Sequence, residues 1–448
     1  MAEFWIKAGQ LLLSLSILVT LHELGHFVPA RLFGTRVKKF YLFFDFLFPL
    51  PNVLNFSLWK IKRGETEYGI GWFPMGGYVQ IDGMVDESMD TEALKQEPKP
   101  WEFRSKPAWQ RLIIMVGGVV VNLILGFMIY SMVLFTWGEE RLPIKNMEYG
   151  VMVDSTMMEY GFENGDRIVQ IGDGNVKYFS EIGMEVLING ESKFIVERDG
   201  QELEINLPEA ANLVLIDKGV KQMFSPLFPF AVLEVMAGSN AKAAGMQADD
   251  IILSVAGEPT PDAYAGITAV KAHANETVDI VVMRGDQEMT LSAEVTDAGT
   301  IGFKLKSMFE LIETETYEYG LFESIPAGFV KTGDKLGNYI SSMKLLFTKE
   351  GASQIGGFGA IGGMFSPTWD WHSFWSMTAF LSLILAFMNI LPIPALDGGH
   401  VMFLLYEIVT GRKPGDKFME YTQTVGMVIL LGLLVFANGN DLVKLFMD

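Results

Sequence analysis

The chain has 448 residues, of which half are hydrophobic, a formal net charge of −20 and no cysteine. A positive mean hydropathy beside so much acidic charge indicates apolar segments in lipid and separate acidic soluble modules, not one core. The acidity argues against nucleic-acid binding, which needs a basic surface, and the lack of cysteine excludes disulfides, a thiol nucleophile and cysteine-bound zinc.

Four segments are apolar and long enough to predict membrane-spanning helices. They are approximately residues 5–28, 112–137, 374–396 and 424–437, and the last is short unless its flanking turns extend it. The first segment has no basic start and no small-residue cleavage site, so we expect it to be retained and not removed as a signal peptide. The predicted fold class is a polytopic α-helical membrane protein.

The first segment carries His22-Glu23-Leu24-Gly25-His26. Residues four apart share a helix face, so His22 and His26 can hold one zinc ion, and Glu23 can act as general base on a zinc-bound water. The alternative is two structural histidines. Membrane context weighs against it, because ionisable residues in a spanning helix are costly and are usually functional.

Residues 68–81 mix glycine with aromatic residues, a pattern that predicts a strand able to present its edge to a substrate. Gly76, Gly77 and Tyr78 are the candidate substrate-binding residues in this stretch. The alternative is a hairpin that only anchors the protein at the membrane interface. The aromatic run over 40–48 fits interfacial embedding and says little about catalysis.

Basic residues predict the orientation of the chain. Lysines and arginines gather in the loop after the first segment and in the turn between the last two, so both regions are expected to be cytoplasmic. The large stretch between the second and third segments is then expected on the opposite, periplasmic side.

This stretch contains two similar units. In each, a small-residue turn leads to an acidic residue, a β-rich run and a strand that ends in a charged glycine turn. The first unit includes residues 161–168 and 197–200, and the second includes 243–252 and 283–286. Both resemble the PDZ fold of bacterial proteases, in which a partner peptide adds a strand to a sheet edge. The alternative is two small β domains without peptide-binding activity.

Residues 320–350 place apolar residues at helical spacing with lysines between them, which predicts an amphipathic helix on the outer membrane surface. The third spanning segment follows, and Pro392 and Pro394 interrupt it before it presents Asp397. A broken helix at membrane depth is tolerated where it lines a polar cavity, so Asp397 is the predicted third ligand of a catalytic zinc site. His400 is a rival, as a ligand or as the partner of one.

Asn389 lies on the same broken helix as Asp397. It is a candidate to hydrogen-bond the unwound backbone of a substrate, and its alternative role is polar packing between helices.

Together these motifs resemble the site-2 protease family of intramembrane zinc metalloproteases, in its bacterial RseP-like branch with tandem PDZ domains. The family pairs His-Glu-x-x-His with a later Asn-x-x-Pro-x-Pro-x-Leu-Asp-Gly, and both are complete here, at residues 22–26 and 389–398. Residues 64–82 look like the family's membrane-dipping β-hairpin. Val119 and Phe358 stand where the family usually has proline, and neither is a ligand.

The predicted organisation has five parts. They are a first transmembrane pair with the hairpin (1–137), PDZ-like domains over 145–210 and 220–306, the amphipathic helix (320–350) and a second transmembrane pair with the Asn-x-x-Pro motif (351–448). The fold is thus about four membrane helices and a β-hairpin, with two inserted periplasmic PDZ-like α+β domains.

The resemblance implies an intramembrane endopeptidase with Zn²⁺ as its cofactor, in the bacterial inner membrane with its active site near the cytoplasmic side. It implies single-span substrates, namely anti-sigma-factor-like regulators after a first extracytoplasmic cut and remnant signal peptides. Peptide C-termini at the PDZ-like domains and membrane lipid are the other expected partners. Two alternatives stay open: a membrane zinc sensor or transporter, which would not need Glu23 as a base, and a non-catalytic PDZ scaffold.

Overall fold

The computed structural model describes residues 2–47, 53–74, 76–84, 97–174, 176–218, 220, 222–343 and 356–447. The chain divides into two units, one formed by Met1–Gly138 with Glu318–Asp448 and the other by Glu139–Tyr317. The second unit begins with strand β5 (Glu139–Arg141) and ends with β17 (Glu315–Tyr317), and these strands pair antiparallel. It is therefore an insertion whose two ends lie side by side.

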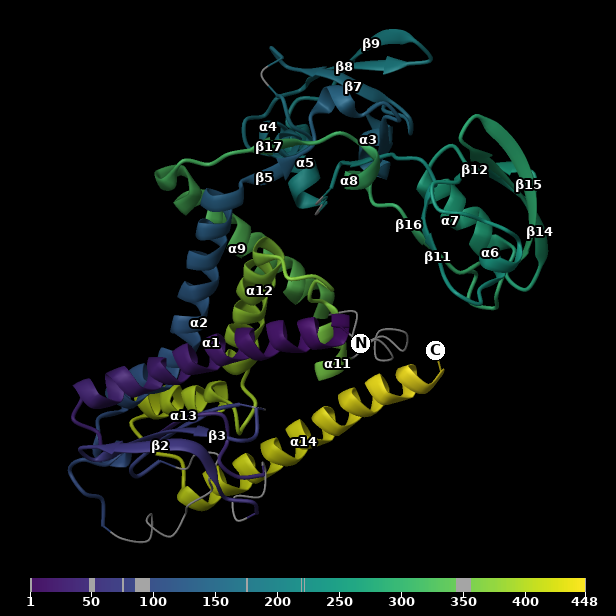
Figure 1. The fold of residues 1–448 in the computed structure, drawn as a ribbon. Coiled ribbons are helices and arrows are strands. Elements are labelled where there is room, and N and C mark those ends of the chain that lie inside the picture. The colour runs from purple at the N-terminus through teal and green to yellow at the C-terminus, as the bar shows by residue number, and fades with distance from the viewer. Residues whose placement is uncertain are drawn as a thin grey trace. The chain divides into compact units, whose positions relative to one another are not determined.

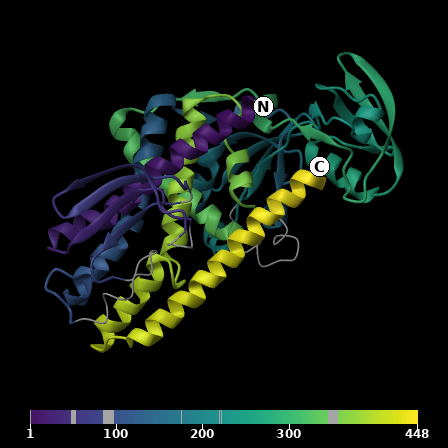
Figure 2. The same ribbon diagram turned by 60° about the horizontal axis from the view of Figure 1, so that its bottom comes forward.

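Within the part of the chain that the structure describes, four helices are long and apolar enough to cross a membrane, which confirms the predicted number. They are α1 (Ala2–Leu32), α2 (Ala108–Trp137), α12 (Trp371–Ile390) and residues Tyr421–Asp441 within α14 (Asp416–Met447). Helix α2 contacts α1, α9, α12 and α13 (Figure 1). Helix α14 runs as one unbroken helix (Figure 2), so its flanking turns do extend the short apolar segment.

The backbones of α1 and α2 touch where the helices cross. A Cβ added to Gly25 would lie 2.5 Å from the carbonyl oxygen of Gly117, and one added to Gly117 would overlap the carbonyl oxygen of Gly25. Small residues allow this close approach, which is a common way for membrane helices to associate. The histidine-bearing end of α1 is thereby held directly against α2.

The predicted break in the third spanning segment is present. Helix α12 ends at Ile390 and α13 (Asp397–Thr410) begins at Asp397. Proline removes a backbone donor and disfavours helix at the preceding residue, so Pro392 and Pro394 keep the intervening chain non-helical. Asp397 consequently lies in the first turn of α13.

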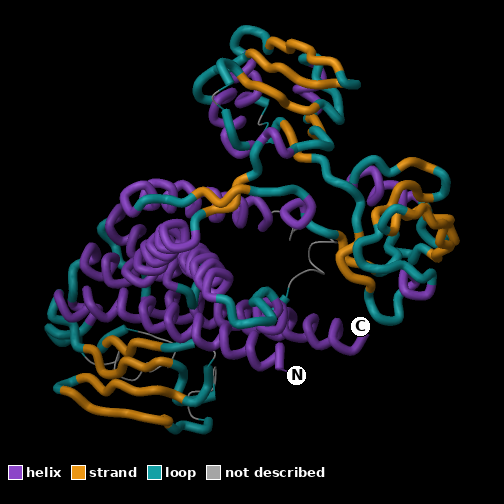
Figure 3. The backbone as a smooth tube through the Cα atoms, turned by 45° about the horizontal axis from the view of Figure 1, so that its top comes forward, coloured by secondary structure: helices purple, strands orange, loops and turns teal. Residues whose placement is uncertain are grey.

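A four-stranded sheet follows α1 in the chain. Its order is β2-β3-β1-β4, with β3 parallel and β4 antiparallel to β1. Figure 3 shows its strands side by side at the lower left. The strands are β1 (Val37–Leu42), β2 (Ser57–Arg63), β3 (Thr66–Gly71) and β4 (Tyr78–Ile81).

The prediction of a hairpin over residues 64–82 is wrong. Strands β3 and β4 lie on opposite sides of β1, and the hairpin in this sheet is β2–β3. The run over 40–48, interpreted as an interfacial segment, begins within the central strand β1. A Cβ added to Gly71 would overlap the carbonyl oxygen of Phe44, so glycine lets the chain cross over β1 before it enters β4.

Helix α9 (Leu321–Met343) has an unusual distribution of side chains. Its buried residues are Ser324, Gly328 and Thr332, while large apolar side chains such as Phe322 and Phe329 are exposed. It packs on α2 through this small, polar face, because a Cβ added to Gly328 would overlap the hydroxyl of Ser131. The amphipathic pattern predicted for 320–350 is present as far as residue 343, and residues 344–350 lie outside the described part. The first unit also contains η2 (Phe103–Ser105) and α11 (Phe358–Gly363).

The inserted unit has two hydrophobic cores. The first includes residues beyond 145–210, namely Leu142, Ile144, Ala211, Leu215, Met223, Phe224 and Ile312, and the second is built from residues between Phe230 and Ile301. Besides β5 and β17, its first part comprises η3 (Ile144–Asn146), β6 (Val151–Val153), α3 (Ser155–Glu159), β7 (Arg167–Ile171), η4 (Phe179–Glu181), α4 (Ile182–Leu187), β8 (Lys193–Arg198), β9 (Gln201–Asn206), α5 (Ala211–Asp217), β10 (Phe224–Pro226) and α8 (Met308–Leu311). Its second part comprises β11 (Val232–Val235), α6 (Asn240–Ala243), β12 (Ile251–Val255), β13 (Glu258–Pro259), α7 (Ala263–Ala272), β14 (Thr277–Arg284), β15 (Gln287–Glu294) and β16 (Phe303–Leu305).

The acidic residue repeated in the two sequence units has the same structural role in both. Asp166 accepts hydrogen bonds of 2.7 and 2.8 Å from Arg198, at the end of β8. Asp250 accepts two of 2.7 Å from Arg284, at the end of β14. In each unit the ion pair joins the turn before the first strand to the charged glycine turn, so the repeated sequence pattern corresponds to a repeated local structure.

We expect Asp250→Asn to lower the free energy of unfolding of the second part by about 2 kcal/mol, because it removes a buried charge-assisted pair. Burial raises the pKa of Asp250, but hydrogen bonds from Arg284 and the Gln247 backbone outweigh this effect and hold the pKa below its ordinary value. Because the pKa of Asp250 is lower in the folded state, its charge stabilises the fold at pH values above the unfolded-state pKa of about 4. This stabilisation is lost as the pH falls through the folded-state pKa. The difference in the free energy of unfolding between wild type and Asp250→Asn should therefore become smaller at acidic pH.

Amide hydrogen exchange of β14 and β15 in the full-length protein would measure this effect. Asp286→Asn, in the exposed turn between these strands, is the matched control. Equal protection in the two variants at neutral pH would contradict a stabilising role for the Asp250 pair.

Candidate metal centre

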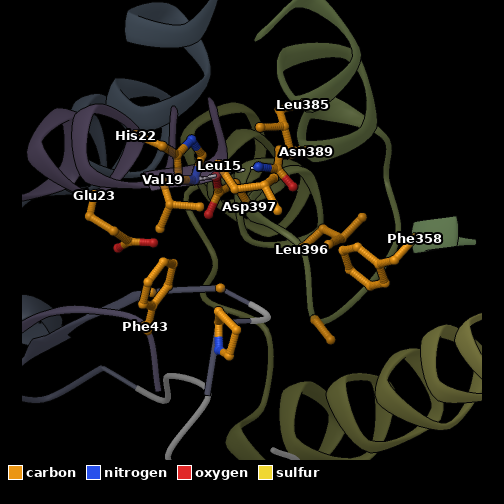
Figure 4. Close-up of a pocket in the computed structure, with 14 residues that line it drawn as sticks. Leu15, Val19, His22, Glu23, Phe43, Phe358, Leu385, Asn389, Leu396 and Asp397 are labelled. Carbon is orange, nitrogen blue, oxygen red and sulfur yellow. Dashed lines mark hydrogen bonds and ion pairs between the residues drawn. The ribbon is translucent and has the colours of Figure 1, made fainter. Parts of the chain in front are cut away.

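Three side chains converge between the end of α1 and the start of α13. Asp397 Oδ2 lies 3.3 Å from His22 Nε2 and 3.4 Å from His26 Nε2, and the two Nε2 atoms lie 3.3 Å apart. Figure 4 shows His22 and Asp397 of this group. Ligands about 2.0–2.1 Å from a tetrahedral zinc ion lie about 3.3–3.4 Å from one another. The spacing of the three atoms therefore fits one zinc ion.

The bonding of Asp397 also fits a cation. Its Oδ2 atom is buried and has no hydrogen-bond partner among the described residues. A buried carboxylate oxygen without a partner is costly, and a metal ion would satisfy it. Across the described part of the chain, His22, His26 and Asp397 are the one group of such side chains placed to hold a metal.

Helix α2 provides the polar groups behind both histidines. His26 Nδ1 lies 2.8 Å from the carbonyl oxygen of Ile114, and His22 Nδ1 lies 3.1 Å from the side-chain amide of Asn122. A carbonyl can only accept, so His26 carries its proton on Nδ1 and leaves the Nε2 lone pair for a metal.

Gly118 provides the space for the two imidazoles. A Cβ added there would overlap His26 Nε2 and lie 2.6 Å from His22 Cε1. Sequence reasoning assigned no role to Gly118 or Asn122. The available signal was a glycine and an amide one turn apart in an otherwise apolar membrane segment.

A cavity of about 240 Å³ adjoins two of the three side chains, His22 and Asp397. Its walls come from α1, the chain after β1, the chain before β4, α11 and the α12–α13 connection (Figure 4). Its lining residues are Leu15, Val19, His22, Glu23, Phe43, Pro74, Gly76, Gly77, Phe358, Leu385, Asn389, Ala395, Leu396 and Asp397. His22 and Asp397 thus face a space whose other walls are mostly apolar.

Glu23 and Asn389 both line this cavity beside the candidate ligands. Glu23 is largely buried, and Asn389 Nδ2 lies 3.4 Å from His22 Nε2. Both are therefore placed to contact a molecule bound at the metal.

Of the predicted substrate-binding glycines and tyrosine, only the glycines line the cavity. A Cβ added to Gly77 would lie 2.7 Å from Val19, one turn before Glu23 on α1. The Tyr78 side chain is buried within the sheet, where its hydroxyl donates a 2.8 Å hydrogen bond to Asp45 and its ring stacks on Tyr41. Tyr78 begins β4, the strand that directly follows the glycines.

His400 is outside the group that can hold the ion. Its Nε2 atom lies 2.8 Å from the side-chain amide of Gln423 on α14. His400 therefore contacts Gln423 on a neighbouring helix and is not one of the candidate ligands.

The aromatic walls of the cavity were not predicted. Phe43 follows β1, and Phe358 begins α11. The chain at Phe358 is fixed by α14, because Gly357 N donates to Asp441 at 3.0 Å and Phe358 N donates to Asn438 at 3.2 Å. Phe43 and Phe358 are distant in sequence, and the one sequence observation at Phe358, that the family usually has proline there, gave no role in a cavity.

Comparison with known proteins gives matches along nearly the whole chain. The profile of the family described as Peptidase family M50 matches residues 10–433. Metalloprotease MmpA of Caulobacter vibrioides is 26% identical over 461 residues, covering 99% of this chain and 96% of the relative. The regulator of sigma E protease of Haemophilus influenzae is 26% identical over 473 residues, covering 99% and 100%. A "Putative zinc metalloprotease" of Vibrio cholerae is 26% identical over 461 residues, covering 97% and 98%.

We expect Gly118→Ala to weaken zinc binding tenfold or more, because the added methyl group displaces the ligand imidazoles and metal affinity is sensitive to their orientation. Gly432→Ala is the matched control, since a Cβ there would meet no other atom within 4 Å. Zinc content after dialysis against a chelator would be measured for both purified variants. Equal zinc retention would show that the imidazoles do not need the space at Gly118.

Proposed function

The chain belongs to peptidase family M50 and is a zinc metalloendopeptidase of the site-2 protease type, and we propose that its catalytic centre is formed by His22, His26, Asp397 and Glu23. Its four apolar helices make it a multi-pass membrane protein. One observation carries the proposal: three candidate ligand atoms from α1 and α13 stand at tetrahedral spacing, and two of these residues, His22 and Asp397, line a cavity that Glu23 also lines.

The residues divide the work of hydrolysis between them. His22, His26 and Asp397 would hold a zinc ion, and the cavity beside His22 and Asp397 would admit water and substrate. Zinc, when bound there, supplies a water of lowered pKa and polarises the scissile carbonyl. Glu23 takes the proton of the attacking water and delivers it to the leaving amine. Asn389 donates its amide N–H groups to the substrate backbone beside the metal.

The substrate is a transmembrane segment bound in an extended conformation. A membrane helix hides its backbone, so it must unwind before a carbonyl can reach the metal. Strand β4 is at the edge of its sheet, and an edge strand offers N–H and C=O groups to a further strand. Gly76 and Gly77 extend this edge into the cavity without side chains that would block the backbone of the substrate.

The inserted unit controls which substrates enter. Its two parts, each with a sheet and helices around its own core, act as PDZ-like domains on the periplasmic side of the bacterial inner membrane. They admit single-span proteins whose outer domain has been removed, such as anti-sigma-factor-like regulators, together with remnant signal peptides. The name of the Haemophilus influenzae relative, a regulator of sigma E protease, supports this substrate class. The exposed apolar side of α9 lies on the periplasmic surface of the inner membrane.

We expect Glu23→Gln to lower the cleavage rate of a single-span model substrate in detergent by 10²–10⁴-fold while zinc stays bound, because the ligands remain and the base is lost. Glu3→Gln, an exposed position on the same helix, is the control and should cleave normally. Cleavage by Glu23→Gln at the wild-type rate would exclude Glu23 as the base. Zinc binding with no cleavage by the wild type, across several substrates, would favour the sensor function.

Deletion of residues 145–306 should allow cleavage of a substrate that keeps its folded outer domain, because the barrier to bulky substrates is removed. A substrate already trimmed outside the membrane is the control, and both enzymes should cut it equally, which shows that the membrane unit is intact. Immunoblotting of the released fragment measures both reactions. Continued resistance of the untrimmed substrate would contradict the size filter.

A further inference from the structure

Asn122 of α2 is a buried side chain that the proposed reaction does not use. It is 0% exposed, and its Nδ2 atom lies 3.1 Å from His22 Nδ1. Its Oδ1 atom is buried and has no hydrogen-bond partner among the described residues. A fully buried amide beside a metal ligand, with one end unsatisfied, requires an explanation.

The chemistry of His22 shows which end of the amide must face it. His22 turns Nε2 toward His26 and Asp397. An imidazole that binds metal through Nε2 carries its proton on Nδ1, and a protonated Nδ1 can only donate. The NH₂ group of Asn122 is also only a donor, so the two groups cannot bond in that arrangement. Turning the carboxamide by half a rotation places Oδ1 at His22 Nδ1, so that a donor meets an acceptor there, and the NH₂ group takes the position in which Oδ1 had no partner.

We infer that Asn122 Oδ1 accepts a hydrogen bond from His22 Nδ1–H and thereby holds His22 in the tautomer that binds zinc, an inference that rests on the ligand set proposed above. Asn122 is a positioning residue, because it acts on the metal through His22.

Helix α2 holds Asn122 in place for this task. Ser382 of α12 donates a 2.7 Å hydrogen bond to the Asn122 backbone oxygen, and both residues are 0% exposed. One face of α2 carries three residues spaced four apart, Ile114, Gly118 and Asn122. Along this face the Ile114 carbonyl orients His26, Gly118 leaves room for both rings, and Asn122 orients His22.

An amide suits this position better than a carboxylate would. The charges of Asp397 and Glu23 together balance those of a divalent zinc ion, so the centre is neutral with an uncharged residue at 122. A further carboxylate would leave a net negative charge in a medium of low dielectric. Water cannot easily replace the acceptor at a fully buried site, so loss of the amide leaves His22 Nδ1–H unpaired.

The test measures zinc affinity of the purified full-length protein by competition with a chromogenic chelator. Asn122→Leu keeps the side-chain volume and removes the acceptor, and we expect it to weaken zinc binding roughly 10- to 100-fold. Asn122→Asp restores an acceptor but adds a charge, so it should recover most of the zinc affinity that Asn122→Leu loses. Thr378→Val, a buried polar-to-apolar change on α12, is the control and should leave affinity unchanged. Asn122→Ala, which removes the acceptor with less bulk, repeats the test should the leucine variant fail to fold.

Cobalt substitution provides a second readout that does not depend on activity. The visible spectrum of Co²⁺ reports ligand geometry, so it should change in Asn122→Leu and stay close to wild type in Asn122→Asp. Wild-type affinity and spectrum in Asn122→Leu would overturn the inference.

His22→Ala separates this failure from failure of the proposed function. If His22→Ala loses zinc while Asn122→Leu keeps it, only the role of Asn122 is wrong. If His22→Ala itself keeps full affinity, the proposed ligand set is wrong and the inference falls with it.

Discussion

The candidate metal centre depends on the contact between Gly25 of α1 and Gly117 of α2, where the two helices cross. Gly25 lies between the two histidines in sequence, and no side chain separates it from Gly117. Because the helix axes are this close, backbone and side-chain groups of α2 reach the imidazole rings directly. A crossing widened by even one methyl group would move those partners out of hydrogen-bonding distance. Close packing of the two helices contributes little stability by itself in lipid, but it sets the positions of the α2 groups around the two histidines.

The second constraint is the interrupted helix between α12 and α13. In a continuous helix, the direction of the side chain at 397 would be set by the preceding turns of α12. The break removes this constraint, and α13 begins as a separate helix with Asp397 in its first turn. The glycines that follow are required by the fold-back, since a Cβ on Gly399 would lie 2.7 Å from the Ile393 carbonyl oxygen. A carboxylate at a helix N-terminus is also favourably placed toward the helix dipole. The same break thus shapes the cavity and positions the carboxylate.

Sequence reasoning succeeded where a feature was local. The pair His22 and His26 follows from helical periodicity, and the break before Asp397 follows from two prolines, although choosing Asp397 over His400 also needed the family resemblance. It failed where a feature depended on which segments meet. Strand β1 was hidden in an aromatic run, so the sheet order was missed, and Phe358 enters the cavity only because α14 holds its backbone. Long-range pairing leaves no periodic signal in one sequence.

The pairing of β5 with β17 has a consequence for how such a protein can change over time. Glu139 faces Tyr317 across this antiparallel pair, and opposed residues in such a ladder lie only about 4.5–5.5 Å apart. The two ends of the inserted chain, at β5 and β17, are therefore adjacent in space. Any module whose own ends are adjacent can take the place of the insertion without moving the helices that carry the metal centre, and a tight turn can replace it entirely. Selection can exchange the outer module while the catalytic unit is preserved.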